Sequence, residues 1–266
     1  MMTDQKLKEL ITRAALRGSN KTSIYMALEK MVGLNPDAVD ELLDSLPFRR
    51  RPWFINYLKF ANTTISPSAT KLSYPLTQIY VYKDFLRKSY CMELISLADE
   101  IAKRSSVSNP SGDVKYDEYR TSSTADIDYD ENKIVPYINN KICKTLNLKE
   151  SLGEAIQIQK YLPGEYYKEH NDYYHWFTPE HDIYTEWMGQ RTWTFMVYLN
   201  DVHEGGETIF KHLNLKIKPK RGMAVFWNNL LPVGFPNYKT IHEAKPPISG
   251  NKYVITKWMR SWSLMD

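Results

Sequence analysis

The sequence predicts a mainly β domain with flanking helices (α+β), in which a double-stranded β-helix, or jelly-roll barrel, is preceded by a small helical N-terminal segment. Three observations predict this fold class. Apolar residues recur at helical spacing in the first 62 residues, short runs of strand type dominate the second half, and turn signals such as Glu204-Gly205-Gly206 separate those runs. The chain has 266 residues, 42% of them hydrophobic, and is therefore long enough to bury the core of such a barrel.

Residues 1–62 are expected to form a set of short helices. Leu7, Leu10 and Ile11 are spaced as on one face of a helix. The pair Asn35-Pro36 is typical of a helix start, because proline is tolerated in the first turn. This segment could serve folding, oligomerisation or recognition of a target, so the oligomeric state stays open.

A linker and the main domain follow this segment. The stretch 63–74 is rich in Thr, Ser and Pro and is interpreted as the linker, which leaves 75–266 as the main domain. The stretch 105–119 has the composition of a mobile loop. Helices are expected at 88–104 and 133–146, and strands at 79–82, 155–161, 191–199, 215–219, 223–227 and 252–262.

Charge, hydropathy and cysteine content limit the partners and the compartment. The net charge of +4 lies within residues 1–74, which carry 11 Lys+Arg and 7 Asp+Glu. So weak a field favours an ordinary solvated surface, and nucleic acid is not expected as a partner. The sequence has no secretory signal and no run of 18 apolar residues, so no membrane partner and a cytoplasmic location are expected. Cys91 and Cys143 are expected to be buried, reduced thiols.

Two histidines and an aspartate form a candidate iron site. His170 and Asp172 follow a turn at Pro163-Gly164, and residues two apart on an extended chain point the same way. A third ligand must come from a distant strand, and His242 suits that role because it precedes the turn before the last expected strand. Two imidazoles and one carboxylate occupy one face of a six-coordinate ferrous ion, which leaves three positions for dioxygen and an oxidisable co-substrate.

Lys252 is the candidate anchor for that co-substrate. In the last expected strand, the period-2 geometry places Lys252, Val254, Thr256 and Trp258 on one face. A lysine that points into a barrel is costly to leave unpaired, so it implies a buried anion. A 2-oxo dicarboxylate could chelate iron through its oxo acid end while its far carboxylate pairs with Lys252.

These candidates lie within a series of short motifs that runs from Pro75 to Trp262. The motifs are Ile79-Tyr-Val-Tyr-Lys-Asp-Phe-Leu86, Arg120-Thr-Ser-Ser123, Tyr161-x-x-Gly-x-x-Tyr-x-x-His170-x-Asp172, Gly189-Gln-Arg-Thr-Trp-Thr-Phe-Met-Val-Tyr-Leu199, Glu204-Gly-Gly-Glu-Thr-Ile-Phe210, Pro219-Lys-Arg-Gly-Met-Ala-Val-Phe226, His242, and Gly250-Asn-Lys252 with Lys257-Trp258. In this order they resemble the motifs of the prolyl 4-hydroxylases, a family of iron- and 2-oxoglutarate-dependent dioxygenases.

The resemblance implies a role for each matching residue. His170, Asp172 and His242 would be the iron ligands, and Lys252 would anchor 2-oxoglutarate with Tyr161 and Thr208 as hydroxyl partners. The residues that would line the groove for a prolyl peptide are Tyr167, Arg191 and Trp258. The implied cofactors and co-substrates are Fe(II), 2-oxoglutarate and O2, with ascorbate as the reductant. The implied partner is a peptidyl-proline substrate.

Two stretches near the expected substrate entrance depart from the family pattern. His242-Glu-Ala-Lys-Pro-Pro lacks the small Gly-Cys-Pro-Val sequence, and the segment between Asp172 and Arg191 is longer than usual. The expected function is hydroxylation of a prolyl residue with release of succinate and CO2. The alternatives are the same chemistry on a free amino acid, a small metabolite or a non-proline side chain, or an inactive barrel that acts as a binding scaffold.

Overall fold

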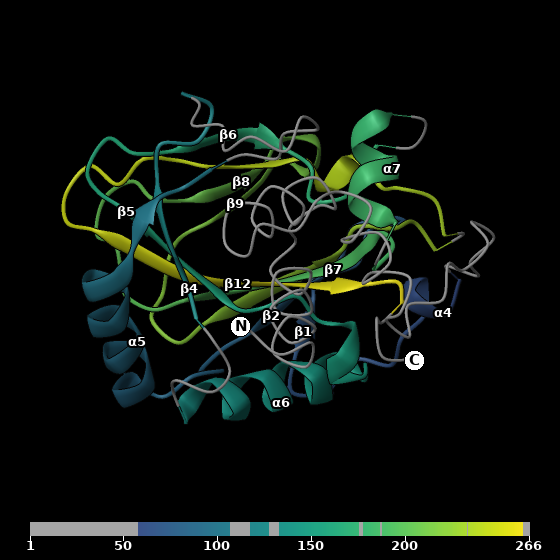
Figure 1. The fold of residues 1–266 in the computed structure, drawn as a ribbon, viewed down its shortest axis with the longest axis horizontal. Helices are drawn as coiled ribbons and strands as arrows, with labels where there is room; N and C mark the ends of the chain where they lie inside the picture. Colours follow the sequence, from purple (N-terminus) through teal and green to yellow (C-terminus); the bar gives the residue numbers. More distant parts are fainter. Residues whose placement is uncertain are drawn as a thin grey trace, which may run out of the picture.

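Two antiparallel sheets, with helices packed on the outer side of the larger one, make up the fold (Figure 1). The computed structural model describes residues 58–106, 118–127, 133–175, 178–186, 188–232 and 234–262. Residues 1–57 of the expected helical segment, and most of the loop expected at 105–119, lie outside the described residues.

The described elements confirm a mainly β chain with flanking helices. The helices are α4 (Leu58–Ala61), α5 (Lys88–Ile101), α6 (Ile134–Leu146) and α7 (Pro179–Thr185). The strands are β1 (Thr70–Lys71), β2 (Ile79–Tyr82), β3 (Lys103–Arg104), β4 (Ser123–Asp126), β5 (Gln157–Tyr161), β6 (Tyr167–His170), β7 (Arg191–Tyr198), β8 (Thr208–Phe210), β9 (Leu215–Ile217), β10 (Ala224–Asn228), β11 (His242–Ala244) and β12 (Lys252–Arg260).

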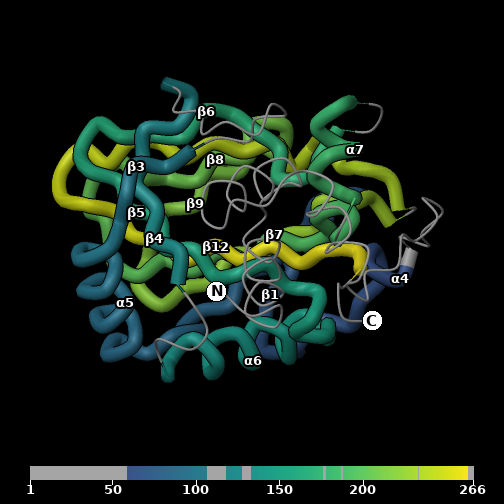
Figure 2. The backbone as a smooth tube through the Cα atoms, viewed as in Figure 1, coloured from purple at the N-terminus to yellow at the C-terminus, as the bar shows by residue number. Residues whose placement is uncertain are grey.

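The large sheet has the strand order β1-β2-β10-β7-β12-β5-β4-β3, and the small sheet has the order β6-β11-β8-β9. The yellow strand β12 crosses the middle of the large sheet, and the tube view shows α5 and α6 on the side away from β6 and β8 (Figures 1 and 2). The jelly-roll topology is confirmed, but the described strands hydrogen-bond as two facing sheets and not as one closed barrel. The inner face of the large sheet is therefore open to a site between the sheets.

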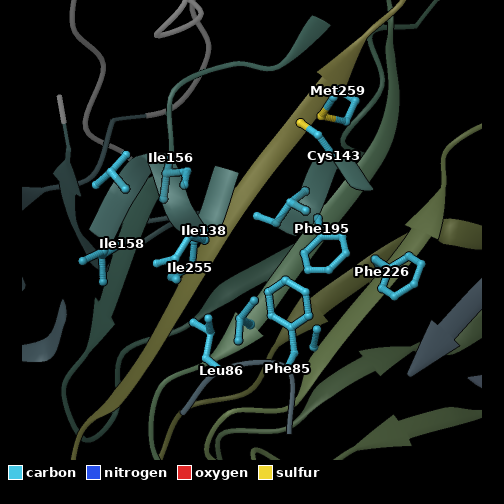
Figure 3. Packing of buried hydrophobic residues seen from close by; sticks show 14 of the residues in the cluster. Phe85, Leu86, Ile138, Cys143, Ile156, Ile158, Phe195, Phe226, Ile255 and Met259 are labelled. Atoms are coloured by element: carbon cyan, nitrogen blue, oxygen red, sulfur yellow. The ribbon is translucent and has the colours of Figure 1, made fainter. Parts of the chain in front are cut away.

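Alternation along the central strands divides the buried residues into two clusters. Phe195 and Ile255 point toward the helices, where they pack with Ile138 of α6 and with Phe85 (Figure 3). The neighbouring residues Met196 and Val254 point the opposite way, toward the small sheet, and belong to the second cluster. Because side chains alternate at period 2, one strand supplies both the helix-covered core and the walls of the inner site.

Several predicted boundaries are wrong for identifiable reasons. The helix expected to reach Arg104 ends at Ile101, because Lys103–Arg104 pairs with β4 as β3. Part of the expected linker, Thr70–Lys71, is strand β1 at the edge of the large sheet. Short strands such as β6 and β11 were not expected, since three or four residues carry little periodicity. The division into an N-terminal segment, a linker and a main domain stays a prediction.

The end of α4 is fastened to the back of the large sheet. The Phe60 side chain is 1% exposed, and its carbonyl oxygen accepts hydrogen bonds from Trp193 Nε1 and Asn228 Nδ2, each at 2.9 Å. Trp193 and Asn228 are paired residues of β7 and β10. The chain before the expected linker therefore contributes a side chain and an acceptor to the core of the main domain.

Replacing Phe60 with alanine is expected to destabilise the protein by about 3–5 kcal/mol, because a large buried ring is removed and the cavity is only partly refilled. The measurement is denaturant unfolding followed by circular dichroism. Lys59→Ala is the matched control, since Lys59 is the exposed neighbour on the same helix and its loss should cost little. Equal stability of the two variants would contradict the assignment of Phe60 to the core.

The cysteine prediction is confirmed. Cys91 on α5 and Cys143 on α6 are both free and buried. Burial raises the pKa of the Cys91 thiol to about 11 and also raises the pKa of Cys143, so both stay protonated near neutral pH. Among the described residues, no helix is both long and apolar enough to cross a membrane.

Candidate metal and co-substrate site

The three predicted metal ligands meet between the two sheets. His170 ends β6 and His242 begins β11, and these two residues face each other in the register of the strand pair. Asp172 lies two residues beyond His170, with one carboxylate oxygen 3.8 Å from His170 Nε2 and the other 3.8 Å from His242 Nε2. One potential ligand atom from each residue lies within 4.8 Å of the other two. Ligand bonds of about 2.1 Å to a shared ion would need only a small closing movement.

Backbone carbonyls fix the orientation of both imidazoles. His170 Nδ1 is 2.8 Å from the Lys168 carbonyl oxygen, and His242 Nδ1 is 3.0 Å from the Thr240 carbonyl oxygen. A carbonyl oxygen can only accept, so each Nδ1 carries the proton and each Nε2 lone pair faces the centre. Burial, reinforced by the neighbouring His242, lowers the pKa of His170 to about 3. The neutral imidazole is the form that binds a metal.

Asp172 completes the donor set as a buried anion. Burial acts to raise its pKa, but electrostatic interactions with His242, His170 and Arg191 and a hydrogen bond from Thr194 hold the pKa below the usual range. Thr194 Oγ1 lies 2.7 Å from Asp172 Oδ2. Two neutral imidazoles with one ionised carboxylate on one side of an open pocket suit a ferrous ion with open coordination positions.

The prediction that Lys252 points inward is confirmed. Lys252, Val254, Thr256 and Trp258 all line the pocket that holds the three ligands. Lys252 is 1% exposed, and among the described residues no carboxylate lies within 4.0 Å of its ammonium group. Its neighbours are instead the rings of Tyr161 and Tyr198, at 5.0 and 5.8 Å. Burial lowers the pKa of Lys252 to about 7, because the charged ammonium is destabilised away from water. An anion that entered the pocket would offset that destabilisation.

The predicted hydroxyl partners, Tyr161 and Thr208, line the same pocket as Lys252. Tyr161 is paired directly with Lys252 across β5 and β12, and its hydroxyl donates to Gln159 at 3.2 Å. Thr208 accepts a hydrogen bond from the Tyr198 hydroxyl at 2.7 Å. Sequence reasoning did not single out Tyr198, although it lies at an alternate position on β7. The pocket has a volume of about 400 Å³ with its mouth included.

The predicted groove residues lie at the other end of the pocket. Tyr167 stacks on the His170 ring, with centroids 3.6 Å apart and planes at 11°. Trp258 lines the pocket, and the Arg191 guanidinium lies 3.9 Å from the centre of the Trp258 ring. Arg191 is held by Glu154, which accepts from Nε at 2.7 Å and from Nη2 at 2.8 Å. The structure thus brings Tyr167 and Trp258 to the site itself and places Arg191 behind Trp258.

Glu154 was missed by sequence reasoning, and it organises this end of the pocket. Its side chain is only 2% exposed and also accepts from Arg260 Nη1 at 3.0 Å, while its carbonyl accepts from Lys257 Nζ at 2.6 Å. The charges of Arg191 and Arg260 offset the effect of burial and keep the Glu154 pKa below its usual range. An acid beside Gly153 carries no sequence signal that distinguishes it from a surface residue.

Known proteins match the part of the chain that carries this site. The family model of the 2OG-Fe(II) oxygenase superfamily matches residues 156–260, a range that includes all three candidate ligands and Lys252. Probable prolyl 4-hydroxylase 4 from Arabidopsis thaliana is 32% identical over 217 residues, which cover 73% of this chain and 71% of that protein. The chain belongs to the prolyl 4-hydroxylase family.

Other members of the prolyl 4-hydroxylase family match over a similar part of the chain. Prolyl 4-hydroxylase subunit alpha-1 from Homo sapiens is 32% identical over 197 residues, which cover 73% of this chain but only 36% of that subunit. The chain therefore matches about a third of the length of that relative. A solved viral collagen prolyl hydroxylase from Paramecium Bursaria Chlorella virus-1, in a 2OG complex, is 29% identical with a TM-score of 0.54, and covers 68% of this chain and 95% of its own.

Proposed function

We propose that this chain is an Fe(II)- and 2-oxoglutarate-dependent dioxygenase that hydroxylates a prolyl residue in a peptide or protein and releases succinate and CO2. One observation carries the proposal: the His170-Asp172-His242 donor set lines the same pocket as the ammonium of Lys252, which has no carboxylate partner among the described residues. A metal site alone would fit many reactions. A buried cation beside it calls for a co-substrate with an anionic far end, which 2-oxoglutarate has.

Each residue has a defined part in this reaction. When bound, iron and 2-oxoglutarate activate dioxygen, with one oxygen atom going to succinate and the other to the substrate C–H bond. His170, Asp172 and His242 would hold the iron, and Lys252 would pair with the far carboxylate of the oxo acid, aided by the hydroxyls of Tyr161 and Thr208. The buried walls exclude water from the reacting groups.

The aromatic residues of the pocket support a prolyl substrate. Tyr167 and Trp258 line the pocket together with the donor set, and aromatic rings pack well on a pyrrolidine ring. Arg191 is stacked on Trp258 and is fixed by Glu154, so it can hold that indole in place. The relatives named as prolyl hydroxylases support a prolyl residue as the substrate of this chain as well.

Mass spectrometry tests the proposal directly. The chain is incubated with Fe(II), 2-oxoglutarate, ascorbate and either a Pro-Gly-rich peptide or free proline, and the expected product is the peptide with one added oxygen. Oxygen gained by free proline or another small molecule would favour the alternative substrates. Absence of 2-oxoglutarate turnover, with and without substrate, would contradict the enzyme and favour the scaffold. The stimulation by ascorbate and the cytoplasmic location stay predictions, and the oligomeric state stays open.

The affinity for 2-oxoglutarate is expected to fall above about pH 7. The pKa of Lys252 in the open pocket is about 7, and only the protonated ammonium can pair with the carboxylate. Binding therefore takes up a proton above this pH, and the dissociation constant should rise about tenfold per pH unit until the pKa of the bound state is reached. Isothermal titration of 2-oxoglutarate into the Mn(II)-loaded protein from pH 6 to 9 measures this. A flat profile would contradict it.

A further inference from the structure

A short chain of buried hydrogen bonds leads from the candidate metal ligand Asp172 into the large sheet. Thr194 Oγ1 is 2.7 Å from Asp172 Oδ2, and Asn229 Nδ2 is 3.0 Å from Thr194 Oγ1. Thr194 is 1% exposed and Asn229 is 0% exposed. We refer to Asn229, Thr194 and Asp172 as the hydrogen-bond relay.

The chemistry of the three groups fixes the direction of each bond. The ionised carboxylate of Asp172 can only accept, so the single hydroxyl proton of Thr194 must be donated to it. The Thr194 oxygen is then left as an acceptor, and it must receive a proton from the amide nitrogen of Asn229. Only one orientation of the Asn229 amide, with its nitrogen toward Thr194, allows both bonds. Asn229 therefore donates to Thr194, and Thr194 donates to Asp172.

The large sheet holds the first two members of the relay rigidly. Thr194 is an inner-face residue of β7 and is paired with Trp227 of β10. Asn229 directly follows β10, where its backbone N–H donates to the Thr192 carbonyl at 2.7 Å and its own carbonyl accepts from Asn237 at 2.8 Å. The two side chains therefore approach Asp172 from central strands that the hydrophobic core fixes in place.

The Asn229 side chain makes no hydrogen bond to the described residues other than the one to Thr194. Among the described residues its Oδ1 atom is buried without a hydrogen-bond partner, so the bond to Thr194 is the one bond that the amide makes. A buried acceptor left unpaired costs free energy. An asparagine kept only for packing would be served as well by leucine, which has a similar volume and no polar atoms.

We propose that Asn229 acts through Thr194 as a positioning residue that reserves one oxygen of Asp172 for the metal. This inference rests on the proposed function. The two oxygens lie equally near the histidines, with Oδ1 3.8 Å from His170 Nε2 and Oδ2 3.8 Å from His242 Nε2. The bond from Thr194 takes up a lone pair of Oδ2, so Oδ1 is the oxygen with both lone pairs left for the ion. A carboxylate that bound through both oxygens would take up one of the three positions that 2-oxoglutarate and dioxygen need. The relay therefore keeps Asp172 a one-oxygen ligand.

Metal affinity in the absence of turnover tests the relay. The dissociation constant for Fe(II), measured anaerobically by competition with a chromophoric chelator, should rise about 10- to 100-fold in Thr194→Val, which keeps the shape but loses the hydroxyl. Thr194→Ser keeps the hydroxyl and should bind close to wild type. Asn229→Leu should change affinity in the same direction as Thr194→Val, with an unfolding temperature near that of wild type. Asn229→Ala replaces it if the leucine variant does not fold.

The double variant separates a relay from two independent effects. Asn229 acts only through the Thr194 hydroxyl, so Thr194→Val/Asn229→Leu should bind Fe(II) no more weakly than Thr194→Val alone. Additive losses would overturn the relay, as would wild-type affinity in Thr194→Val or equal losses in Thr194→Val and Thr194→Ser. Failure of the wild-type chain to bind Fe(II) would instead overturn the proposed function, so the two failures are distinguishable.

Discussion

Replacing Asp172 with alanine is expected to lower iron-dependent succinate formation by at least about a thousandfold. Within the described part of the chain, the carboxylate is the one anionic donor of the set, and its loss would leave two neutral imidazoles to hold a dication. Stabilisation of the metal and of the charge that it carries during the reaction is worth several kcal/mol, and about 4 kcal/mol corresponds to a thousandfold in rate. Succinate is measured in a coupled assay with and without a peptide substrate.

Asp182→Ala is the matched control for this variant. Asp182 lies on α7 with its side chain 80% exposed, and its carboxylate forms an ion pair with the neighbouring His181, the one such pair it makes among the described residues. This variant should turn over like wild type. Circular dichroism should show both proteins folded, since Asp172 receives a single side-chain hydrogen bond, from Thr194. Full turnover by Asp172→Ala would remove the metal assignment.

Replacing Lys252 with methionine is expected to weaken 2-oxoglutarate binding about 10- to 100-fold while stabilising the unliganded protein. Methionine keeps the apolar stem and deletes the charge, so the loss is that of a charge-assisted hydrogen bond. The gain in stability arises because the folded wild-type protein holds a buried cation, the Lys252 ammonium, whose pKa is lowered from 10.5 to about 7 by burial. Removal of that cation should be worth a few kcal/mol at or below pH 7.

The sign of this stability change has a definite pH dependence. Between about pH 7 and 10.5, wild-type Lys252 is neutral when folded and protonated when unfolded. The unfolded state then binds the extra proton, so the wild-type free energy of unfolding rises with pH relative to the methionine variant. The advantage of the variant should therefore be largest below pH 7 and disappear above pH 10.5. Urea unfolding of both proteins across this range measures the difference.

Lys257→Met separates the anchor from a general effect of buried lysines. Lys257 lies on the same strand at 2% exposure, but its ammonium donates to the Glu154 carbonyl and it does not line the pocket. Burial lowers the pKa of Lys257 as well, to about 8, so this variant also removes a destabilised buried cation, but it should keep the affinity of wild type for 2-oxoglutarate. Equal affinity of Lys252→Met and wild type would refute the anchor role.

The sequence predicted that His170, Asp172 and Lys252 would share a pocket, because alternation along an extended chain carries that much of their geometry. His170 and Asp172 are two residues apart after a turn, and Lys252 begins a run whose alternate residues all face the pocket. Register, by contrast, cannot be read from one strand. Only the pairing of β7 with β10 brings Thr194 and Asn229 together, 35 residues apart in the chain.

The buried ion pairs of Glu154 could not be predicted from the sequence for a related reason. Glu154 and Arg260 are 106 residues apart, and nothing in their local sequence shows that each neutralises the other in the interior. A weaker signal did exist for Thr194, because the period-2 rule that placed Lys252 inside would also have placed alternate residues of the 191–199 run inside. The roles predicted for Tyr161, Thr208, Tyr167, Arg191 and Trp258 stay predictions that ligand-bound experiments must test.

The fastening of Phe60 sets where a protease-resistant fragment can begin. Trp193 and Asn228 both donate to the Phe60 carbonyl, so cleavage on the C-terminal side of this residue would strip a ring from the interior and orphan two donors behind the iron site. Limited trypsin digestion should thus yield a stable product that starts no later than Phe60, and not one that starts at Leu72 after cleavage at Lys71. Any shortened version made for crystallisation inherits the same boundary.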